Sequence, residues 1–361
     1  MADSTGPIGI SLLTLDPWTV GGTQTYARGL VDALAGHGSL DYRVFVPETA
    51  PEAGGDLRTV VVPEFPAGRS RLGRVAGLAR ATLADGRLRR ALDREAAAAF
   101  HFPLTVMLPR VGAPAATTIH DLQHEAFPQF FSRPQLAYRR RVYRRSVRAS
   151  RIVIAVSKHV RDDLVARLGY PRERVRVIYH GVDRERFAPD GRAREPFLLY
   201  PANWWPHKNH ELLLEAFALV RQERPELRLV LTGSDHPPGL PDGVTSLGRV
   251  SDERLVDLYR SAAALVFPSL YEGFGLPPLE AMACGCPVAV SRVASLPEVC
   301  GDAAVYFDPT SVDDVVRGIC EVLDRPAAGG PERAALFTWE EFAHRHDAVY
   351  RELAGGGEPF G

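Results

Sequence analysis

The segment ALVFPSLYEGFGLPPLEAMA, residues 264–283, joins a short apolar run to a helix-forming stretch through a glycine-rich loop. The run ALVFPS predicts a buried strand. The helix begins near LPPL, where proline is tolerated because first-turn amides lack an intrahelical partner. Gly273 and Gly275 let the loop backbone approach a ligand closely, and the amides of such a helix start favour a phosphate. The segment therefore predicts an α/β fold with an anion site at a strand-to-helix loop.

Outward from this segment, short apolar runs alternate with amphipathic stretches along the chain, as in βα units and parallel sheets. In the first half the expected strands are Ile8–Leu15, Tyr42–Val46, Arg58–Val62, Ala97–Phe102, Ala115–His120, Arg151–Val156 and Arg174–Tyr179. In the second half they are Phe197–Pro201, Leu227–Thr232, Val244–Leu247, Ala263–Pro268, Pro287–Ser291 and Ala303–Phe307. The expected helices are Thr23–Ala35, Arg74–Ala84, Pro134–Ala149, Lys158–Leu168, Asn209–Glu223, Asp252–Arg260, Pro278–Cys284, Val312–Leu323 and Thr338–Leu353.

The length of 361 residues exceeds what one ordinary hydrophobic core organises, so we expect two domains. The segment His180–Pro196 is rich in Gly, Pro and charge and is interpreted as a linker. We expect one doubly wound domain over residues 1–185, a second over 186–337, and a last helix with a tail over 338–361. Ligands of open α/β sheets bind beyond the carboxyl ends of the strands, so a cleft between the two domains is the expected active site.

Two carboxylates bracket the glycine loop. Glu272 and Glu280 lie eight positions apart and cannot both contact a phosphate. They are better placed to accept hydrogen bonds from hydroxyls on either side of a diphosphate, one from a sugar and the other from a ribose. The alternative is an ordinary helix start with a capping glutamate, which the run Gly-Phe-Gly-Leu-Pro-Pro disfavours.

A second loop, PANWWPHKNH at 201–210, contains one of the only two lysines among 43 basic residues. Lys208 lies where the next helix is expected to begin, a position that normally disfavours a cation. An ammonium there can neutralise pyrophosphate oxygens as a sugar departs. The alternative is a solvated lysine at a helix terminus. Trp204 and Trp205 either form a wall of a sugar site or pack in the core.

Two weaker signals lie in the first half. His120 and Asp121 end an expected strand, and an imidazole there can hydrogen-bond a sugar or handle protons. The alternative is a structural histidine satisfied by a loop carbonyl. Gly21 and Gly22 follow the first strand and permit close approach to an anion, although the G-x-G-x-x-G dinucleotide fingerprint is absent.

Composition and missing motifs exclude several classes of protein. The net charge of −1 argues against a nucleic-acid partner, and four cysteines confined to the last quarter fit neither a zinc site nor a disulfide scaffold. Neither a P-loop nor a G-x-S-x-G elbow occurs. Asp-x-Asp is also absent, so we expect no metal and no cofactor. The amino terminus lacks a signal-peptide pattern, and we expect a cytoplasmic protein.

Taken together, these segments resemble family 4 of the glycosyltransferases. The resemblance covers nearly the whole chain and rests on GGTQTYARGL, IHDLQHEAFPQFFS, RIVIAVS, HGVD at 180–183, PHKN, LTGS, LGRVSDERL and YEGFGLPPLEAMACGCPVAVS, in the family's order. It implies a GT-B fold of two Rossmann-like domains and retention of anomeric configuration. It also implies a nucleotide-sugar donor on the second domain, an acceptor on the first, and a last helix that crosses back to the first domain.

The resemblance also implies residue roles. Glu272 would contact hydroxyls of the donor sugar and Glu280 the ribose, while Lys208 would bind the diphosphate. His120 would contact the sugar near the reacting bond, and Gly22 a phosphate from the opposite domain. The remaining donor contacts would come from the glycine loop and the helix it opens, at Gly273, Phe274, Gly275 and Leu276.

One position departs from the family pattern. Many members carry an arginine in the loop before the lysine, whereas this chain has Ala202. Arg249 or His207 would then supply the missing positive or polar group. The wording of HDLQHE and PHKN favours GDP-mannose as donor, with UDP- and dTDP-hexoses open. A nucleotide-sugar epimerase and a non-catalytic sugar-nucleotide-binding subunit remain as alternatives.

The acceptor is expected to be a glycan, a lipid-linked glycan or a small molecule. The arginine-rich run RPQLAYRRRVYRRSVRASR, residues 133–151, bears on this expectation. It either touches anionic lipid at the inner face of the membrane or forms a solvated helix face in a chain that uses arginine by default.

Overall fold

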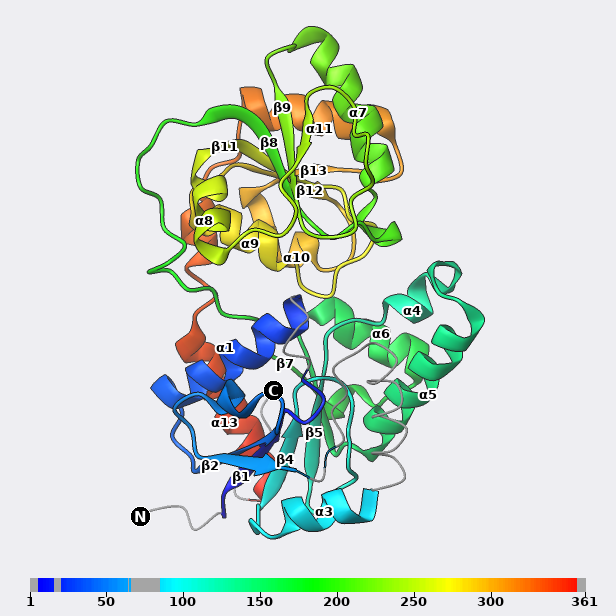
Figure 1. Cartoon of the computed structure of the whole chain (residues 1–361), viewed down its shortest axis with the longest axis vertical. Helices are drawn as coiled ribbons and strands as arrows, with labels where there is room; N and C mark the ends of the chain where they lie inside the picture. The colour runs from blue at the N-terminus through cyan, green and yellow to red at the C-terminus, as the bar shows by residue number, and fades with distance from the viewer. Residues whose placement is uncertain (1–5, 16–20, 64, 66–84, 356–361) are drawn as a thin grey trace. The chain divides into compact units, whose positions relative to one another are not determined.

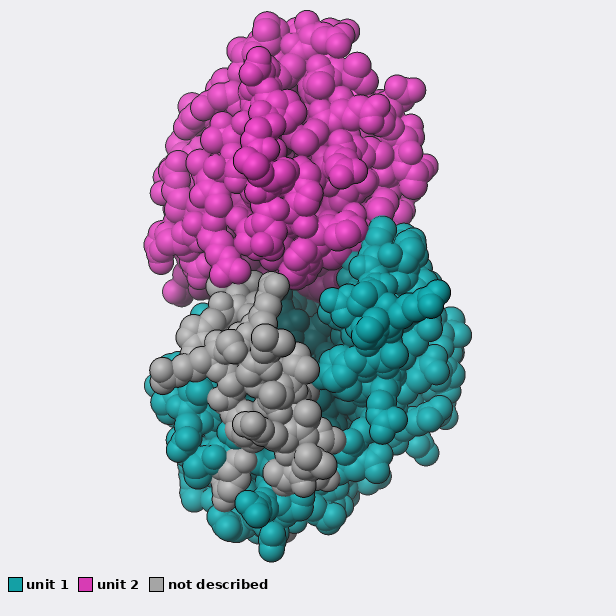
Figure 2. Space-filling model, turned by 45° about the vertical axis from the view of Figure 1, so that its right-hand side comes forward, with its two compact units in different colours: residues 1–181, 339–361 teal, residues 182–338 magenta. Residues whose placement is uncertain are grey.

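A computed structural model describes residues 6–15, 21–63, 65 and 85–355. The chain divides into two compact units: unit 1 comprises Met1–Gly181 and Trp339–Gly361, and unit 2 comprises Val182–Thr338 (Figure 2). The chain therefore leaves unit 1 once and re-enters it for its last helix. Within the described ranges, every helix is too short or too polar to cross a lipid bilayer.

Unit 1 contains a seven-stranded parallel sheet in the order β3-β2-β1-β4-β5-β6-β7 (Figure 1). Four strands, β1, β4, β5 and β6, are buried along their whole length, because helices cover both faces of a parallel sheet. The order reverses between β1 and β4, which makes this the topological switch point. The strands are β1 (Ile8–Ser11), β2 (Tyr42–Pro47), β3 (Thr59–Val62), β4 (Ala99–Phe102), β5 (Ala115–Ile119), β6 (Ile152–Ala155) and β7 (Val175–Val177).

The helices of unit 1 follow the strands in alternation. They are α1 (Gly22–His37), α3 (Asp85–Asp93), α4 (Gln123–Ala126), α5 (Arg133–Ala149), α6 (Lys158–Leu168) and α13 (Trp339–Ala354). Short 3₁₀ turns are η1 (Pro51–Gly54), η2 (Pro128–Phe130) and η3 (Arg172–Arg174). The expected helix Arg74–Ala84 lies outside the described residues. The periodicity analysis missed α3 because its arginine-rich sequence carries few apolar residues.

The last helix, α13, packs along α1, red beside blue in Figure 1. Gly29 of α1 lies against the indole of Trp339, so closely that a Cβ at this position would lie 2.2 Å from the ring. The Asp347 carboxylate accepts hydrogen bonds from the Ser39 amide and hydroxyl, at 2.8 and 2.7 Å. At the far end of α13, Arg176 and Glu352 form an ion pair at 2.6 Å. Packing and polar contacts thus hold α13 in unit 1.

Unit 2 contains a six-stranded parallel sheet in the order β10-β9-β8-β11-β12-β13. Its switch point lies between β8 and β11. The strands are β8 (Glu195–Pro201), β9 (Arg228–Thr232), β10 (Val244–Ser246), β11 (Ala262–Phe267), β12 (Val288–Ser291) and β13 (Val305–Phe307). Its helices and 3₁₀ turns are η4 (Pro206–Lys208), α7 (His210–Glu223), α8 (Asp252–Ser261), α9 (Leu276–Ala283), α10 (Leu296–Cys300), η5 (Gly301–Ala303), α11 (Val312–Asp324) and α12 (Gly330–Ala334).

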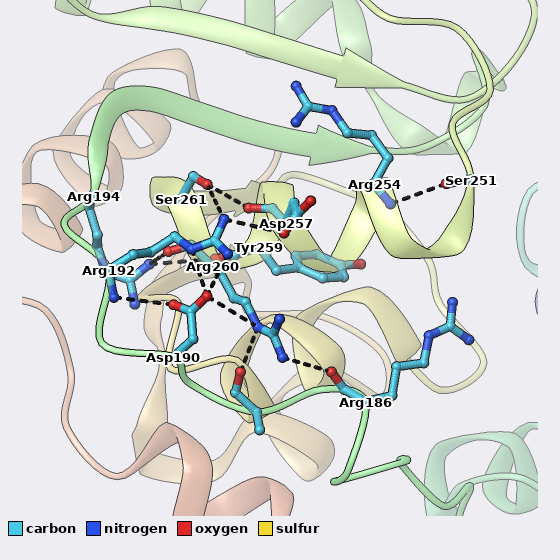
Figure 3. Close-up of polar contacts among 11 residues, drawn as sticks. Arg186, Asp190, Arg192, Arg194, Ser251, Arg254, Asp257, Tyr259, Arg260 and Ser261 are labelled. Carbon is cyan, nitrogen blue, oxygen red and sulfur yellow. Dashed lines mark hydrogen bonds and ion pairs between the residues drawn. The ribbon is translucent and has the colours of Figure 1, made fainter.

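The segment His180–Pro196, which was interpreted as a linker, is bound to unit 2 by ion pairs and hydrogen bonds (Figure 3). Arg192 pairs with Asp190 at 2.5 Å and with Asp257 of α8 at 3.2 Å. From α8, the Arg260 side chain donates to the Ala188 carbonyl at 2.8 Å. The Arg194 guanidinium donates to the Ala262 carbonyl at 2.8 Å. The segment does join the two units, and its arginines and those of α8 bond carbonyls and carboxylates around the end of α8.

Candidate functional site

The predicted site residues of unit 2 meet at its switch point. Lys208 lies in the loop after β8 and Glu272 in the loop after β11, and these two strands are hydrogen-bonded neighbours. The Lys208 Nζ lies 2.6 Å from Oε1 of Glu272, and the two side chains are 14% and 13% exposed. Parallel strands end at the same edge of a sheet, so residues 64 positions apart form one ion pair. The structure thus brings together two of the three residues predicted to be catalytic.

The sequence predicted Lys208 at the start of the helix that is now α7, but the residue does not lie there. It ends the 3₁₀ turn η4, and Asn209 follows with φ 59°, in the left-handed region, before α7 begins at His210. The left-handed residue breaks the turn from the helix, so the ammonium is not aligned with the helix dipole. Glu272 supplies its counter-charge instead.

Asn209 ties the Lys208 loop to two neighbouring loops. Its side-chain Nδ2 donates to the carbonyl of Pro268, just past β11, at 3.2 Å, and to that of Pro309, just past β13, at 2.8 Å. The hydroxyl of the buried Tyr200 donates to the Lys208 carbonyl at 2.6 Å. These bonds fix the Lys208 backbone against the carboxyl edge of the sheet.

The glycine loop is held equally firmly. The Ser295 hydroxyl lies within hydrogen-bond distance of the carbonyls of Glu272, at 2.9 Å, and of Phe274, at 2.7 Å. Gly275 has φ 104°, which side chains rarely adopt, and a Cβ there would lie 2.7 Å from Leu296. Only glycine fits this position, which immediately precedes α9. Because Pro277 and Pro278 carry no N–H, Leu276 supplies the free amide of the first turn of α9, directly after this held loop.

Glu280 faces a different partner from Glu272. The Tyr259 hydroxyl of α8 donates to Oε2 of Glu280 at 2.9 Å. Burial raises the pKa of the Glu280 carboxyl to about 7, an effect that the Tyr259 bond and the charge of Arg186 only partly offset. The two glutamates therefore differ in electrostatic environment: Glu272 is paired with a cation, whereas Glu280 is half-buried against a neutral hydroxyl.

The remaining residues of the glycine loop have distinct positions. The ring of Phe274 packs edge-to-face on Phe337, with centroids 5.9 Å apart, so the backbone rather than the ring is suited to contact a ligand. Gly273 and Leu276 are half-buried, and Leu276 is the first residue of α9.

The two candidates for replacing the missing arginine are placed differently. Ala202 is buried, with 7% exposure, so this position faces the interior. His207 is also buried, and its carbonyl accepts from the Leu270 amide at 2.8 Å, which joins the loops after β8 and β11. Arg249 is exposed and follows β10, two strands and about 10 Å from β8 across the sheet. His207 therefore lies in the loop of the ion pair, and Arg249 at the sheet edge.

The two tryptophans separate into the two expected roles. Trp204 stacks on His210 at the start of α7, with ring centroids 4.4 Å apart and an interplanar angle of 25°. Trp205 is 48% exposed, and its ring lies 5.7 Å from that of His207. Trp204 is thus a packing residue, and Trp205 is the one available to a ligand.

In unit 1, His120 follows β5 and bonds a loop carbonyl. Its Nε2 lies 2.7 Å from the Pro103 oxygen, and because a carbonyl only accepts, Nε2 carries the proton and Nδ1 is the ring's acceptor. Burial lowers the pKa of His120. The ring packs edge-on against Tyr26, with centroids 4.7 Å apart. The Asp121 carboxylate accepts from the Gln123 amide, so it caps the loop into α4.

Tyr26 belongs to a buried hydrogen-bonded chain that reaches α13. His346 Nδ1 donates to the Phe342 carbonyl at 2.8 Å, so its Nε2 accepts from the Tyr26 hydroxyl at 2.9 Å. The Tyr26 oxygen then accepts from the Thr118 hydroxyl at 3.1 Å, and Thr118 accepts from His101 Nε2 at 2.8 Å. A single direction of hydrogen-bond donation, from His101 through Thr118 and Tyr26 to His346, gives each hydrogen bond one donor and one acceptor. All four side chains are neutral.

The glycine pair of unit 1 lies at the start of a long helix. Gly22 is the first residue of α1, which is 16 residues long and follows Gly21 in extended conformation at φ 177°. Among the residues that the structure describes, none lies within 4 Å of a Cβ built at Gly22, so packing against them does not require glycine there.

Sequence reasoning missed Asn209, Tyr259, Ser295 and Tyr26, which hold the predicted residues in place. Asn209 and Tyr26 stand inside segments that carry the family resemblance, and this was their only signal. Ser295 and Tyr259 act across 21 or more positions, and no local pattern announces such a contact.

Comparisons with known proteins identify the family and the fold. The family model described as Glycosyltransferase Family 4 matches residues 20–186, and that described as Glycosyl transferases group 1 matches residues 182–336. O-antigen chain mannosyltransferase B of Escherichia coli is 32% identical over 70% of this chain and 74% of its own. The MMP alpha-(1->4)-mannosyltransferase of Mycolicibacterium hassiacum is 34% identical, over 55% of this chain and 54% of its own.

Among solved structures, a sucrose-phosphate synthase from Thermosynechococcus elongatus superposes with a TM-score of 0.76 at 24% identity. The match covers 98% of this chain and 100% of the other, and it bears on the fold alone. With both family models matched in order and the paired sheets described above, the chain belongs to family 4 of the glycosyltransferases and has the GT-B fold.

Proposed function

We propose that this glycosyltransferase moves a hexose from a nucleoside diphosphate sugar to an acceptor hydroxyl with retention of configuration. The observation that carries the proposal is the Lys208–Glu272 pair at the switch point of unit 2, which joins the loop after β8 to the glycine loop that opens α9. GDP-mannose is the proposed donor, because relatives that match this chain are named mannosyltransferases. The acceptor is proposed to be a glycan, carried on a lipid or free, or a small molecule.

The residues of unit 2 divide the donor between them. Lys208 and the backbone amides of the glycine loop up to Leu276, the first residue of α9, bind the diphosphate, because an ammonium and outward-facing amides both attract anions; Pro277 and Pro278, which follow, carry no N–H. Glu272 accepts hydrogen bonds from the sugar hydroxyls. Glu280 accepts from the ribose, while Tyr259 holds its carboxyl in place. The backbone of Gly273 to Gly275 approaches the ligand.

The residues of unit 1 contact an uncharged sugar hydroxyl, at His120, and a phosphate, at Gly22. His120 is neutral with Nδ1 as its acceptor, which suits a sugar hydroxyl and not a phosphate oxygen. The open space over Gly22, at the start of α1, leaves room for a phosphate.

The transfer itself needs no strong protein base. The acceptor hydroxyl attacks the face from which the diphosphate departs, and a departing phosphate oxygen takes its proton. Lys208 and the backbone amides of the glycine loop and Leu276 stabilise the charge that develops on the leaving group. Because these groups meet that charge, we propose that no metal ion takes part.

A donor panel tests the proposal. The protein is incubated with GDP-mannose and with UDP- and dTDP-hexoses, with and without lipid-linked and small-molecule acceptors, and released nucleoside diphosphate is measured. We expect GDP release that depends on an acceptor. Donor turnover without acceptor would indicate an epimerase or hydrolase, and binding without turnover across the panel would indicate a non-catalytic subunit.

Helix α5 is proposed to contact an anionic membrane surface. It contains seven arginines and no acidic residue, and Tyr138 on it is 50% exposed. Two of its arginines, Arg140 and Arg144, pair with Glu125 at 2.9 and 3.2 Å and are committed to the fold. Co-sedimentation should rise with the anionic lipid content of vesicles. Binding that ignores lipid charge would instead favour a solvated helix face.

A further inference from the structure

The Lys208–Glu272 ion pair has a consequence beyond donor binding, one that rests on the proposed function. The two side chains neutralise each other at 2.6 Å, although each is assigned to a different part of the donor. We propose that this pair discriminates the intact nucleotide sugar from the nucleoside diphosphate product, and that its re-formation helps to expel the product after transfer.

The argument follows from what each ligand offers. A nucleotide sugar gives Lys208 phosphate oxygens and gives Glu272 sugar hydroxyls, so both side chains exchange one partner for another. A nucleoside diphosphate gives Lys208 its phosphates but offers Glu272 no sugar. With only 13% of its side chain exposed, Glu272 would lose its counter-charge with little water to replace it. The ion pair and the product therefore compete for one ammonium.

The surrounding structure lets the pair open and close by side-chain rotation alone. The Lys208 backbone is held by the Tyr200 hydroxyl at 2.6 Å and the Glu272 backbone by Ser295 at 2.9 Å. The Lys208 Nζ also lies 5.2 Å from the centre of the Phe267 ring, a cation–π contact that retains the ammonium when Glu272 releases it. Both partners are thus anchored within reach of each other.

The other glutamate of the motif does not share this property. Glu280 bonds the neutral hydroxyl of Tyr259, so a ligand that engages Glu280 need not break an ion pair. Discrimination between donor and product is accordingly assigned to Glu272.

The test is the substitution Glu272→Gln, which removes the charge and keeps the shape. Calorimetric titrations measure GDP and GDP-mannose, or the nucleotide and nucleotide sugar that the donor panel selects, without acceptor. We expect the nucleoside diphosphate to bind about tenfold more tightly than to the wild type, and the nucleotide sugar to bind more weakly. Glu321→Gln, which removes a carboxylate paired with Arg317 on α11, is the matched control and should change neither affinity.

A double substitution separates this effect from a general loss of negative charge. When Lys208→Met is present, adding Glu272→Gln should no longer tighten binding of the nucleoside diphosphate, because the gain acts through Lys208. A gain that persists in the double variant would overturn the inference. So would an unchanged or weakened affinity of Glu272→Gln for the nucleoside diphosphate.

The proposed function fails separately, if the wild type binds no nucleotide or nucleotide sugar of the panel. Should Glu272→Gln not fold, as judged by circular dichroism, the wild type still decides. We expect its affinity for the nucleotide sugar to equal or exceed that for the nucleoside diphosphate. A nucleoside diphosphate that binds the wild type ten or more times more tightly would contradict the inference.

Discussion

The candidate site of unit 2 consists of charged side chains, whereas that of unit 1 consists of neutral ones. Unit 2 uses charge, with Lys208 paired to Glu272 and with a buried carboxyl at Glu280. Unit 1 uses neutral imidazoles and hydroxyls, in which His120 packs on Tyr26 and Tyr26 bonds His346. Charges suit a diphosphate whose negative charge grows during reaction, whereas neutral acceptors suit hydroxyls. The contrast supports the proposal that unit 2 supplies the charged groups that meet the leaving group and that His120 of unit 1 meets an uncharged hydroxyl.

Removing the cation should break this contrast most severely. We expect Lys208→Ala to lower the transfer rate by about 100- to 1000-fold, because leaving-group charge then lacks its ammonium. The rate is measured as acceptor-dependent release of nucleoside diphosphate. Lys158→Ala, at the only other lysine, is the matched control and should keep a rate within about threefold of wild type. Equal losses in both variants, or none at Lys208, would contradict the assignment.

Acid should act on unit 1 through its buried histidines. Burial lowers the pKa of His346 to about 3 and of His180 to about 4, from 6.5 when exposed. The unfolded chain then binds more protons, so stability is complete above pH 6.5 and falls as pH drops toward these values. At pH 5 the loss is about 2 kcal/mol for each histidine.

Urea unfolding at pH 7.5 and pH 5, followed by tryptophan fluorescence in a Trp204→Phe, Trp205→Phe background that leaves the signal to unit 1, measures this loss. His346→Gln keeps a hydrogen-bonding side chain that does not titrate, so its stability should depend less on pH than that of the wild type. A wild-type stability that is flat between the two pH values would show that these imidazoles are not buried neutral groups.

The same contrast explains how much of the site could be predicted from sequence. The glycine loop and the lysine of unit 2 could be recognised locally, because the run Gly-Phe-Gly-Leu-Pro-Pro is unusual for a plain turn and lysine is rare in this chain. Glu272 and Lys208 are indeed in contact. The thirteen expected strands all occur, since buried parallel strands are short apolar runs. In unit 1, two interpretations of His120 were left open, and its contact with the Pro103 carbonyl is the one expected of a structural histidine.

What could not be predicted depends on contacts between distant segments. The chain from His346 through Tyr26 to His101 joins α13, α1 and β4, and each residue alone resembles an ordinary core aromatic. The same holds for Asn209, whose left-handed backbone moved the start of α7 past Lys208. Local pattern identifies charged loops, whereas neutral networks become visible only when the fold is known.

A finer test concerns Glu280, whose pKa is raised to about 7. A ribose hydroxyl donates to the ionised carboxylate, so donor affinity should rise by up to about tenfold between pH 6 and pH 8. Folding stability should change in the opposite sense. The folded state holds the proton more tightly than the unfolded chain, so this carboxyl destabilises the protein as pH rises from 4.5 through 7.

Titration calorimetry of the donor at pH 6, 7 and 8 measures the affinity. Glu280→Gln should bind more weakly and show a flatter pH profile, whereas Glu321→Gln, which also removes a carboxylate from unit 2, should keep the wild-type profile. A profile unchanged in Glu280→Gln would assign the titration to another group, the phosphate included.

The smallest expected effect is that of a chelator, and it sharpens the contrast by asking whether the charge of unit 2 is sufficient. If Lys208 and the glycine-loop amides up to Leu276 neutralise the negative charge of the departing diphosphate, a divalent ion is not needed for this purpose. Transfer in EDTA should then stay within about twofold of the untreated rate. A larger loss that added Mg²⁺ or Mn²⁺ reverses would mean that the ammonium works beside a metal ion. Lys208→Ala could then be partly rescued by raising the metal concentration, whereas a chelator-resistant enzyme should show no such rescue.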